Sequence, residues 1–394
     1  MLLGEIVLSD IPKEKKRFKI SGTLIFNIAV AVISIWLIIN FVCTENGLID
    51  LLKRPDSFKW GWVIAGLLVF DGNMIIDGLV TQIYLSAEYP QFRFCDSLKT
   101  AFIGVFFGAV TPSNTGGQPM QLYFLSQKNV RIGYGSACMT QKFIVYQLVT
   151  TSFSIFAVIV RFGFFSTAFT NFWSSAFIVV GFLVQLAVTA MFLIVCFAEG
   201  FTKKIIRLVY KIMKVLPFVK DPMKKIRSLT REFKMFHTAN RMLMRNKKRL
   251  LVIFLLVMVQ IICIMSVPYF IYIAFDMPAA AAANHMPVAS LFDFLCIQSF
   301  VLFTSNLVPL PGASGGAELA FSMYFSTYFV MGSINKIKPA ILLWRFITYY
   351  GAMLLTAPFS YYTKGKKKTA EISKSVLDDI AAEAEAADIE AKNV

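Results

Sequence analysis

Long runs without a charged residue constrain the fold of this chain most. The runs Ile20–Thr44, Phe162–Ala198 and Leu250–Phe275 contain no Asp, Glu, Lys or Arg. Each run exceeds the roughly 20 apolar residues that an α-helix needs to cross a bilayer. The chain as a whole is 57% hydrophobic and only 16% charged, which is far from the composition of a soluble globular protein. The sequence therefore predicts an all-α polytopic membrane protein.

The distribution of basic residues predicts how the chain is threaded. Sixteen Lys and Arg residues, against two acids, lie between Thr202 and Arg249, and residues 1–19 are also basic. Cytoplasmic loops carry an excess of Lys and Arg, so an even number of crossings must separate these two segments. We expect two membrane repeats, 20–200 and 250–363, joined by a basic cytoplasmic linker over 201–249 that lies on the membrane surface. Residues 364–394 would form a cytoplasmic tail, first basic and then acidic.

A polar stretch that no continuous helix can carry interrupts the apolar sequence at Phe106–Met120, FFGAVTPSNTGGQPM. Pro112 lacks a backbone donor, and the paired glycines that follow it give the most permissive backbone. A second stretch, Asn306–Glu318, repeats the pattern Pro-x-x-x-Gly-Gly followed by a polar side chain. At membrane depth, broken backbone is tolerated only where protein or water satisfies its polar groups. The two stretches are therefore a candidate site.

The apolar arms beside each broken stretch are too short to cross a bilayer. We expect two re-entrant helical hairpins, at about 100–126 and 290–331, and about six full spans elsewhere. The charge distribution makes the first hairpin enter from the cytoplasmic side and the second from outside. That is the inverted repeat of many transporters, with the site where the repeats meet. The alternative is that each hairpin makes two full crossings.

Four features carry a resemblance to a known family: the TPSNTGGQP stretch, the VPLPGASGGAE stretch, the Gln141-Lys142 pair and Arg345. They resemble the membrane domain of the lysylphosphatidylglycerol synthase/flippase family, known in bacteria as the multiple peptide resistance factor. The resemblance covers about residues 15–363. It implies a lipid flippase in a bacterial-type cell membrane that moves a charged phospholipid, such as lysyl-phosphatidylglycerol, and contributes to antimicrobial peptide resistance.

The resemblance also predicts what this chain does not do. The full-length resistance factor carries a soluble aminoacyl-transferase domain after its membrane part, whereas this chain ends in an acidic tail. We therefore expect a stand-alone member without lysyltransferase activity, despite any such label by similarity. Its expected partners are anionic or aminoacylated phospholipids, a separate aminoacyl-lipid synthase and other copies of itself. Both termini are expected in the cytoplasm.

The candidate substrate-binding residues are polar side chains and glycines of the broken stretches, together with intramembrane cations. They are Thr111, Ser113, Asn114, Gly116, Gly117, Gln118, Lys142, Asn306, Gly315, Gly316, Glu318 and Arg345. We favour Arg345 over Lys142 for a lipid phosphate, because a guanidinium makes bidentate contacts and an ammonium acts as a point charge. Glu318 would pair either with an aminoacyl ammonium or with Arg345. Close helix packing would explain the glycines, but not the flanking prolines and hydroxyls.

Two acids, Asp71 and Asp77, lie in the second predicted span, which covers about Trp60–Leu85. Charges within a membrane helix are expensive and are functional by default. Six residues apart, at about 100° per residue, they point to different faces of the helix, so both cannot serve one narrow site. Each is either part of the site or a structural partner of Lys142 or Arg345.

Two further functions remain open beside the flippase. The same hairpins would suit a secondary transporter of a soluble solute or of a polyprenyl-linked glycolipid. A membrane transferase would use Glu318 or Asp71 as general base, but no convincing nucleophile–base pair accompanies them. The two histidines lack metal-ligand spacing, and no phosphate-binding loop occurs. We therefore expect no cofactor, no metal and no nucleic-acid partner.

Overall fold

The structure is a computed structural model that describes residues 58–161, 163, 172–215, 222–305, 307–308, 310–331 and 334–360. The predicted basic N-terminus, the first predicted span and the predicted cytoplasmic tail lie outside the described residues.

Five helical segments in the described residues are long and apolar enough to cross a membrane, which confirms a polytopic α-helical membrane protein. Their outward surfaces carry large apolar side chains such as Ile64, Leu68 and Leu255, as a helix facing lipid requires. The five are α3 (Trp60–Leu85), α6 (Ile132–Val160), α8 (Phe172–Phe197), α11 (Lys247–Ala274), and a composite of α15 (Ile337–Arg345), the π-helical η4 (Phe346–Gly351) and α16 (Ala352–Ser360).

Two helical hairpins break where the prolines and glycines occur. In the first hairpin, α4 (Phe94–Ala109) and α5 (Gly117–Gln127) flank the short turn η2 (Pro112–Asn114). In the second, α13 (Leu291–Ser305) and α14 (Gly316–Phe329) flank η3 (Pro311–Ala313). Every arm has 16 residues or fewer, which is short of a full crossing.

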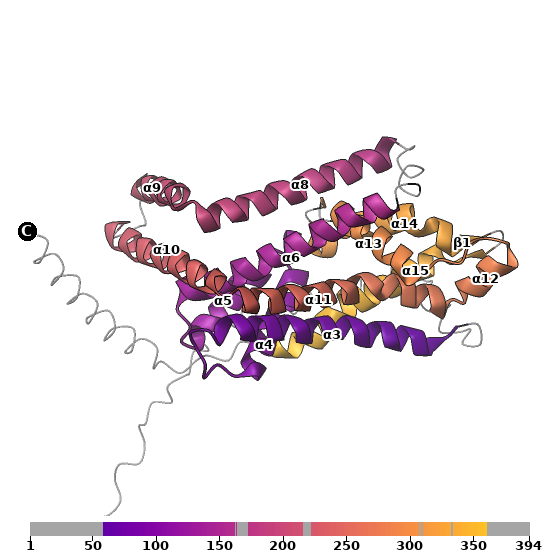
Figure 1. The fold of residues 1–394 in the computed structure, drawn as a ribbon, viewed down its shortest axis with the longest axis horizontal. Helices are drawn as coiled ribbons and strands as arrows, with labels where there is room; N and C mark the ends of the chain where they lie inside the picture. The colour runs from indigo at the N-terminus through magenta and orange to yellow at the C-terminus, as the bar shows by residue number, and fades with distance from the viewer. Residues whose placement is uncertain are drawn as a thin grey trace, which may run out of the picture.

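The hairpins enter the bundle from opposite ends (Figure 1). One end, here called the basic end, carries α9 (Glu199–Val215) and α10 (Pro222–Arg245), and the Gly133 amide at the start of α6 donates to Glu232 of α10. The first hairpin also starts at the basic end, where Gln82 near the end of α3 donates to the Phe92 carbonyl just before α4. At the far end, Arg161 after α6 pairs with Asp293 of α13. The turns η2 and η3 contact each other between the two ends.

Short elements complete the far end and the linker. Helix α12 (Met277–Ala283) follows α11, and the two-residue strands β1 (Val330–Met331) and β2 (Ile334–Asn335) pair antiparallel between α14 and α15. The sequence did not predict this strand pair. The basic linker forms two helices, and α10 packs against α6.

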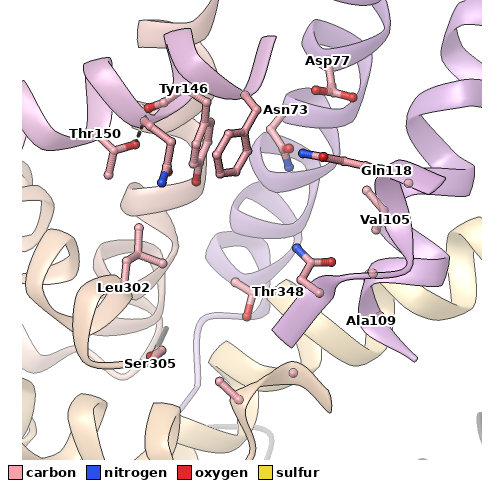
Figure 2. Close-up of a pocket in the computed structure, with 18 of the residues that line it drawn as sticks. Asn73, Asp77, Val105, Ala109, Gln118, Tyr146, Thr150, Leu302, Ser305 and Thr348 are labelled. Atoms are coloured by element: carbon pink, nitrogen blue, oxygen red, sulfur yellow. Dashed lines mark hydrogen bonds between the residues drawn. The ribbon is translucent and has the colours of Figure 1, made fainter. Parts of the chain in front are cut away.

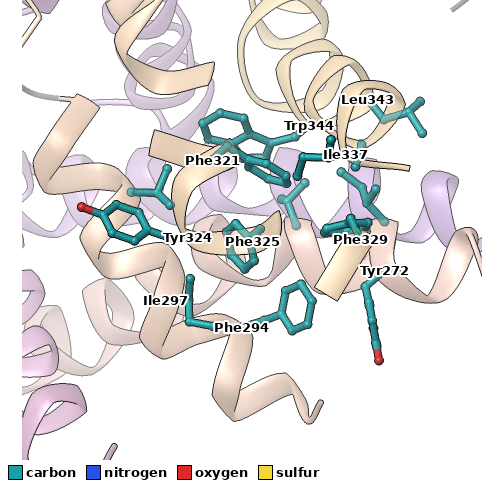
Figure 3. Close-up of a cluster of buried hydrophobic side chains, with 14 of the residues drawn as sticks. Tyr272, Phe294, Ile297, Phe321, Tyr324, Phe325, Phe329, Ile337, Leu343 and Trp344 are labelled. Carbon is teal, nitrogen blue, oxygen red and sulfur yellow. The ribbon is translucent and has the colours of Figure 1, made fainter. Parts of the chain in front are cut away.

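An aromatic cluster fixes the second hairpin against α11 and α15 (Figure 3). The rings of Phe294 and Phe325 stack with centroids 5.1 Å apart, and the rings of Phe321 and Trp344 lie 5.0 Å apart. All four side chains are buried. Large aromatic rings supply most of the packing area in such cores, so this cluster holds α14 in register with the helix that carries Arg345.

Candidate functional site

The turn of the first hairpin is closed by its own side chains. The Thr111 hydroxyl donates to the Phe107 carbonyl at 2.6 Å and accepts from the Gly116 amide at 2.8 Å. Asn114 adopts a left-handed backbone, with φ of 58°. Thr111 therefore satisfies backbone groups that the break in the helix leaves unpaired, which an apolar setting requires.

Glycine lets the two arms of this hairpin touch. A Cβ atom on Gly117 would lie 2.6 Å from the Gly104 carbonyl oxygen, which is too close for any side chain. On the other side of the turn, a Cβ on Gly108 would overlap the Asn114 side chain. Gly104 and Gly117 thus have the packing role that glycines commonly have between membrane helices.

The turn of the second hairpin needs glycine for its backbone. Gly312 and Gly315 have φ of 61° and 84°, a region that other residues rarely adopt. The Glu318 carboxylate accepts from the Gly315 amide at 2.6 Å and so caps α14. Its other oxygen lies 2.5 Å from Nε of Arg345, whose side chain is buried. Glu318 and Arg345 therefore neutralise each other at the start of α14.

A cavity of about 650 Å³ lies beside the two turns, walled by α3, α4, α5, α6, α8, α11, α13 and η4 (Figure 2). Figure 2 shows Asn73, Asp77 and Gln118 gathered on one side of this cavity, with Leu302 and Ser305 of the second hairpin on the other. Among the described residues, seven uncharged amide side chains line it: Asn73, Asn114, Gln118, Gln121, Gln147, Gln185 and Gln260.

One ion pair also lines the cavity. Nζ of Lys142 lies 2.9 Å from Oδ2 of Asp77 and donates to the Thr81 hydroxyl at 3.2 Å. The Gln260 amide approaches the other Asp77 oxygen at 3.4 Å. The Lys142 and Asp77 side chains keep 14% and 18% of their surface exposed, so both face the cavity while paired.

The amides differ in how far the protein satisfies them. Gln185 of α8 donates to the Gln147 side chain of α6 at 2.9 Å, and Gln121 donates to the Thr100 carbonyl at 3.1 Å. For the Gln118 side chain, the described residues offer no hydrogen-bond partner. Because an amide carries donors and an acceptor together, the lining presents both kinds of group to a ligand.

The structure brings five of the predicted residues to the cavity: Asp77, Asn114, Gly117, Gln118 and Lys142. Thr111 and Gly116 build the turn instead. The Ser113 side chain and all of Asn306 lie outside the described residues. Gln141, beside Lys142, turns away and donates to Asn240 of α10 at 2.5 Å.

The second hairpin contributes differently from the sequence-based expectation. Gly315, Gly316, Glu318 and Arg345 do not line the cavity. Lys142 faces the cavity, whereas Arg345, favoured above for the headgroup, is enclosed by its pairing with Glu318 and by the Trp344 and Tyr349 rings. Asp71 does not line the cavity either, and it forms no ion pair with the described residues.

Sequence reasoning missed the amides of the long helices and Tyr349. Asn73, Gln147, Gln185 and Gln260 lie within long apolar helices and Gln121 lies in the short arm α5, so an amide side chain in an apolar segment was the available signal. An uncharged amide in a membrane helix is less conspicuous than a charge, although it too needs a partner. No cluster of three or more His, Cys, Asp or Glu side chains suited to a metal occurs in the part of the chain that the structure describes.

Comparison with known proteins decides the family. Residues 24–356 match the family described as the lysylphosphatidylglycerol synthase TM region. The chain belongs to this family. The match confirms the resemblance carried by the two broken stretches and fits a lipid-related function in the membrane.

Two relatives match over most of their length. A membrane protein of Archaeoglobus fulgidus is 25% identical over 343 residues, which cover 84% of this chain and 94% of the relative. An uncharacterized protein of Mycoplasma pneumoniae is 22% identical over 362 residues, which cover 86% of this chain and 88% of the relative. No solved structure matches the chain significantly.

Proposed function

We propose that this family member is a lipid flippase that moves the headgroup of a charged phospholipid through the cavity beside η2 and η3. The observation that carries the proposal is the meeting of two broken hairpins, entering from opposite ends, beside a polar cavity in an otherwise apolar bundle. Broken helices that meet at a polar site are the arrangement by which many transporters expose one site alternately to two sides.

Helix α8 supplies the side at which acyl chains remain in the bilayer. It lines the cavity with Gly181, Val184, Gln185 and Val188. Only 22% of its most apolar stretch is buried, against at least 39% in the other four spanning segments. A headgroup passing beside this loosely packed wall would leave its lipid tails outside, where the lipid-facing surface is apolar.

The charge distribution suggests how the protein is oriented in the membrane, and the family suggests which lipid it moves. The basic end, with α9 and α10, would face the cytoplasm of a bacterial-type cell, and aminoacylated phosphatidylglycerol such as lysyl-phosphatidylglycerol is the family's eponymous lipid. The exposed basic face of α9, including Lys204, Arg207 and Lys211, suits a helix on an anionic membrane surface. Without a phosphate-binding loop in the chain, transport would run downhill or be coupled to an ion gradient.

Lipid translocation in proteoliposomes tests the proposal. Gln118→Cys, in a background without the six native cysteines, places a reactive thiol in the cavity at a side chain whose amide has no partner in the described structure. A bulky thiol reagent should abolish movement of acyl-labelled phospholipids by this variant. Leu319→Cys, at an exposed position of α14 away from the cavity, should tolerate the same reagent. Unimpaired movement after full modification of Gln118→Cys would contradict the proposal.

The amide-rich lining favours a second candidate, a secondary transporter of a soluble solute. Amides bind hydroxyl groups of any polar molecule, and 650 Å³ is an ordinary size for a small-molecule site. Dependence of binding on acyl chains separates the candidates. A glycerophosphate headgroup without acyl chains should compete poorly for a flippase and well for a solute transporter.

A further inference from the structure

The charges that line the cavity cancel. Asp77 and Lys142 are the only charged residues among its described lining, and they pair at 2.9 Å. The neighbouring Glu318–Arg345 pair is internally neutral and does not line the cavity.

We infer that the cavity selects lipid headgroups by net charge and prefers a zwitterionic headgroup with one phosphate and one ammonium. The inference rests on the proposed flippase function and revises its substrate, because a net-neutral zwitterionic headgroup takes the place of the cationic lysyl-phosphatidylglycerol for which the family is named. A headgroup with a net charge would bring an uncompensated charge into a cavity within the membrane bundle whose own charges already cancel, which is expensive. A net-neutral zwitterion brings none.

The ion pair is also suited to direct contact with such a headgroup. Lys142 has three donors, of which the Asp77 carboxylate and the Thr81 hydroxyl occupy two. One donor is left for a phosphate oxygen. The Asp77 carboxylate has acceptor sites beyond its bonds to Lys142 and Gln260, and these suit an ammonium. The two headgroup charges would extend the existing ion pair into a row of alternating charges, and the cavity amides would donate hydrogen bonds to the ester and phosphate oxygens of the lipid.

Single neutralising substitutions should shift the preference in opposite directions. Asp77→Asn leaves the cavity with a net positive charge and should favour phosphatidylglycerol, which is anionic. Lys142→Gln leaves it negative and should favour lysyl-phosphatidylglycerol, which is cationic. We expect each shift to be about tenfold or more relative to phosphatidylethanolamine, because one unmatched buried charge costs several times the thermal energy. The double variant is neutral again and should return to the zwitterionic lipid.

Asp71→Asn is the matched control, because it removes the same charge from the same helix at a position that does not line the cavity. Its lipid preference should equal that of the unmodified protein. The sign of the two single shifts separates charge from structure, because loss of a purely structural ion pair would affect both single variants in the same way and would not reverse the lipid preference between them.

The experiment uses equimolar phosphatidylethanolamine, phosphatidylglycerol and lysyl-phosphatidylglycerol with two readouts. Native mass spectrometry of the full chain gives the ratio of bound lipids, and acyl-labelled lipids in proteoliposomes give translocation rates. Opposite shifts in the single variants with recovery in the double variant support the inference. Bound-lipid ratios that do not change, or that shift in one direction in both single variants, overturn it. Correct binding ratios without translocation would refute the flippase function and leave the charge selection standing.

Discussion

The Tyr349 hydroxyl donates a hydrogen bond of 2.9 Å to the Ala109 carbonyl at the end of α4. The same ring fills the space beside Gly312 of η3, where a Cβ atom would lie 2.5 Å from it. One side chain of the segment α15–η4–α16 thus touches the end of α4 in the first hairpin and the turn η3 of the second. Its position in the π-helical η4, a distortion common at functional sites, turns the ring toward them.

Tyr349→Phe should loosen this link. Removing the hydroxyl leaves the Ala109 carbonyl without this donor and should cost about 1 kcal/mol of stability. Lipid translocation should also slow, because Tyr349 no longer ties η4 to the end of α4. Thermal unfolding in detergent and proteoliposome assays measure the two effects. Tyr269→Phe is the control, since the Tyr269 ring packs against Tyr272 and Phe294 but its hydroxyl has no hydrogen bond to the described residues. Equal behaviour of the two variants would argue against the link.

Gly117→Ala should destabilise the first hairpin. The new methyl group would meet the Gly104 carbonyl oxygen, so α4 and α5 must separate at a cost of about 1–3 kcal/mol. Gly72→Ala in α3 adds the same methyl group where nothing lies within 4 Å and should leave the melting temperature unchanged or raised, because alanine favours helix. If the Gly117→Ala and Gly72→Ala proteins have the same melting temperature, α4 and α5 do not pack this closely.

Glu318→Gln should be strongly destabilising, because the Arg345 side chain is 7% exposed and would lose its counter-charge. Breaking a buried pair from one side costs about 3–5 kcal/mol. Asp276→Asn breaks the Lys59–Asp276 pair, whose side chains are about half exposed, and should cost about 1 kcal/mol or less. Thermal melts of the two variants compare the pairs directly. If Glu318→Gln proves as mild as Asp276→Asn, the pair is not a structural element of the second hairpin.

Spin labels on α9 should locate that helix on the membrane surface. Leu208 and Arg207 are both exposed, yet adjacent residues of a helix point about 100° apart. In bilayers with anionic lipid, a label at Leu208→Cys should be relaxed by oxygen dissolved in the acyl region. A label at Arg207→Cys should respond to a water-soluble nickel chelate. Two water-accessible labels would place α9 away from the bilayer.

Much of the fold follows from patterns that are local in sequence. Uncharged runs define the spans, and the turns coincide with Pro112 and Pro311 next to paired glycines, a combination that breaks a helix more reliably than the single prolines within α11 and α16 do. The opposite directions of the hairpins follow from counting basic residues on either side of each run. These properties depend on backbone chemistry and bilayer thickness rather than on distant contacts.

The lining of the cavity depends on distant contacts, and sequence reasoning reached only part of it. The Asp77–Lys142 pairing joins residues 65 positions apart. From the sequence alone, Asp77 could equally well have paired with Arg345. Arg345 was favoured for the headgroup from its chemistry alone. In the structure Arg345 pairs with Glu318, and the aromatic packing of α14 on α15 brings the two side chains together. The amides were missed because a single Gln in an apolar helix does not reveal which face it occupies.

Photochemical labelling tests most directly whether headgroups pass through this cavity. A phospholipid with a photoreactive diazirine in its headgroup would be activated during translocation, and the labelled peptides would be identified by mass spectrometry. The account predicts labels at cavity residues of α5, α6 and α11, above all near Gln118, Gln147 and Gln260, with competition by unlabelled lipid. Labels confined to the helix ends and to lipid-facing residues such as Leu68 and Leu255 would contradict it.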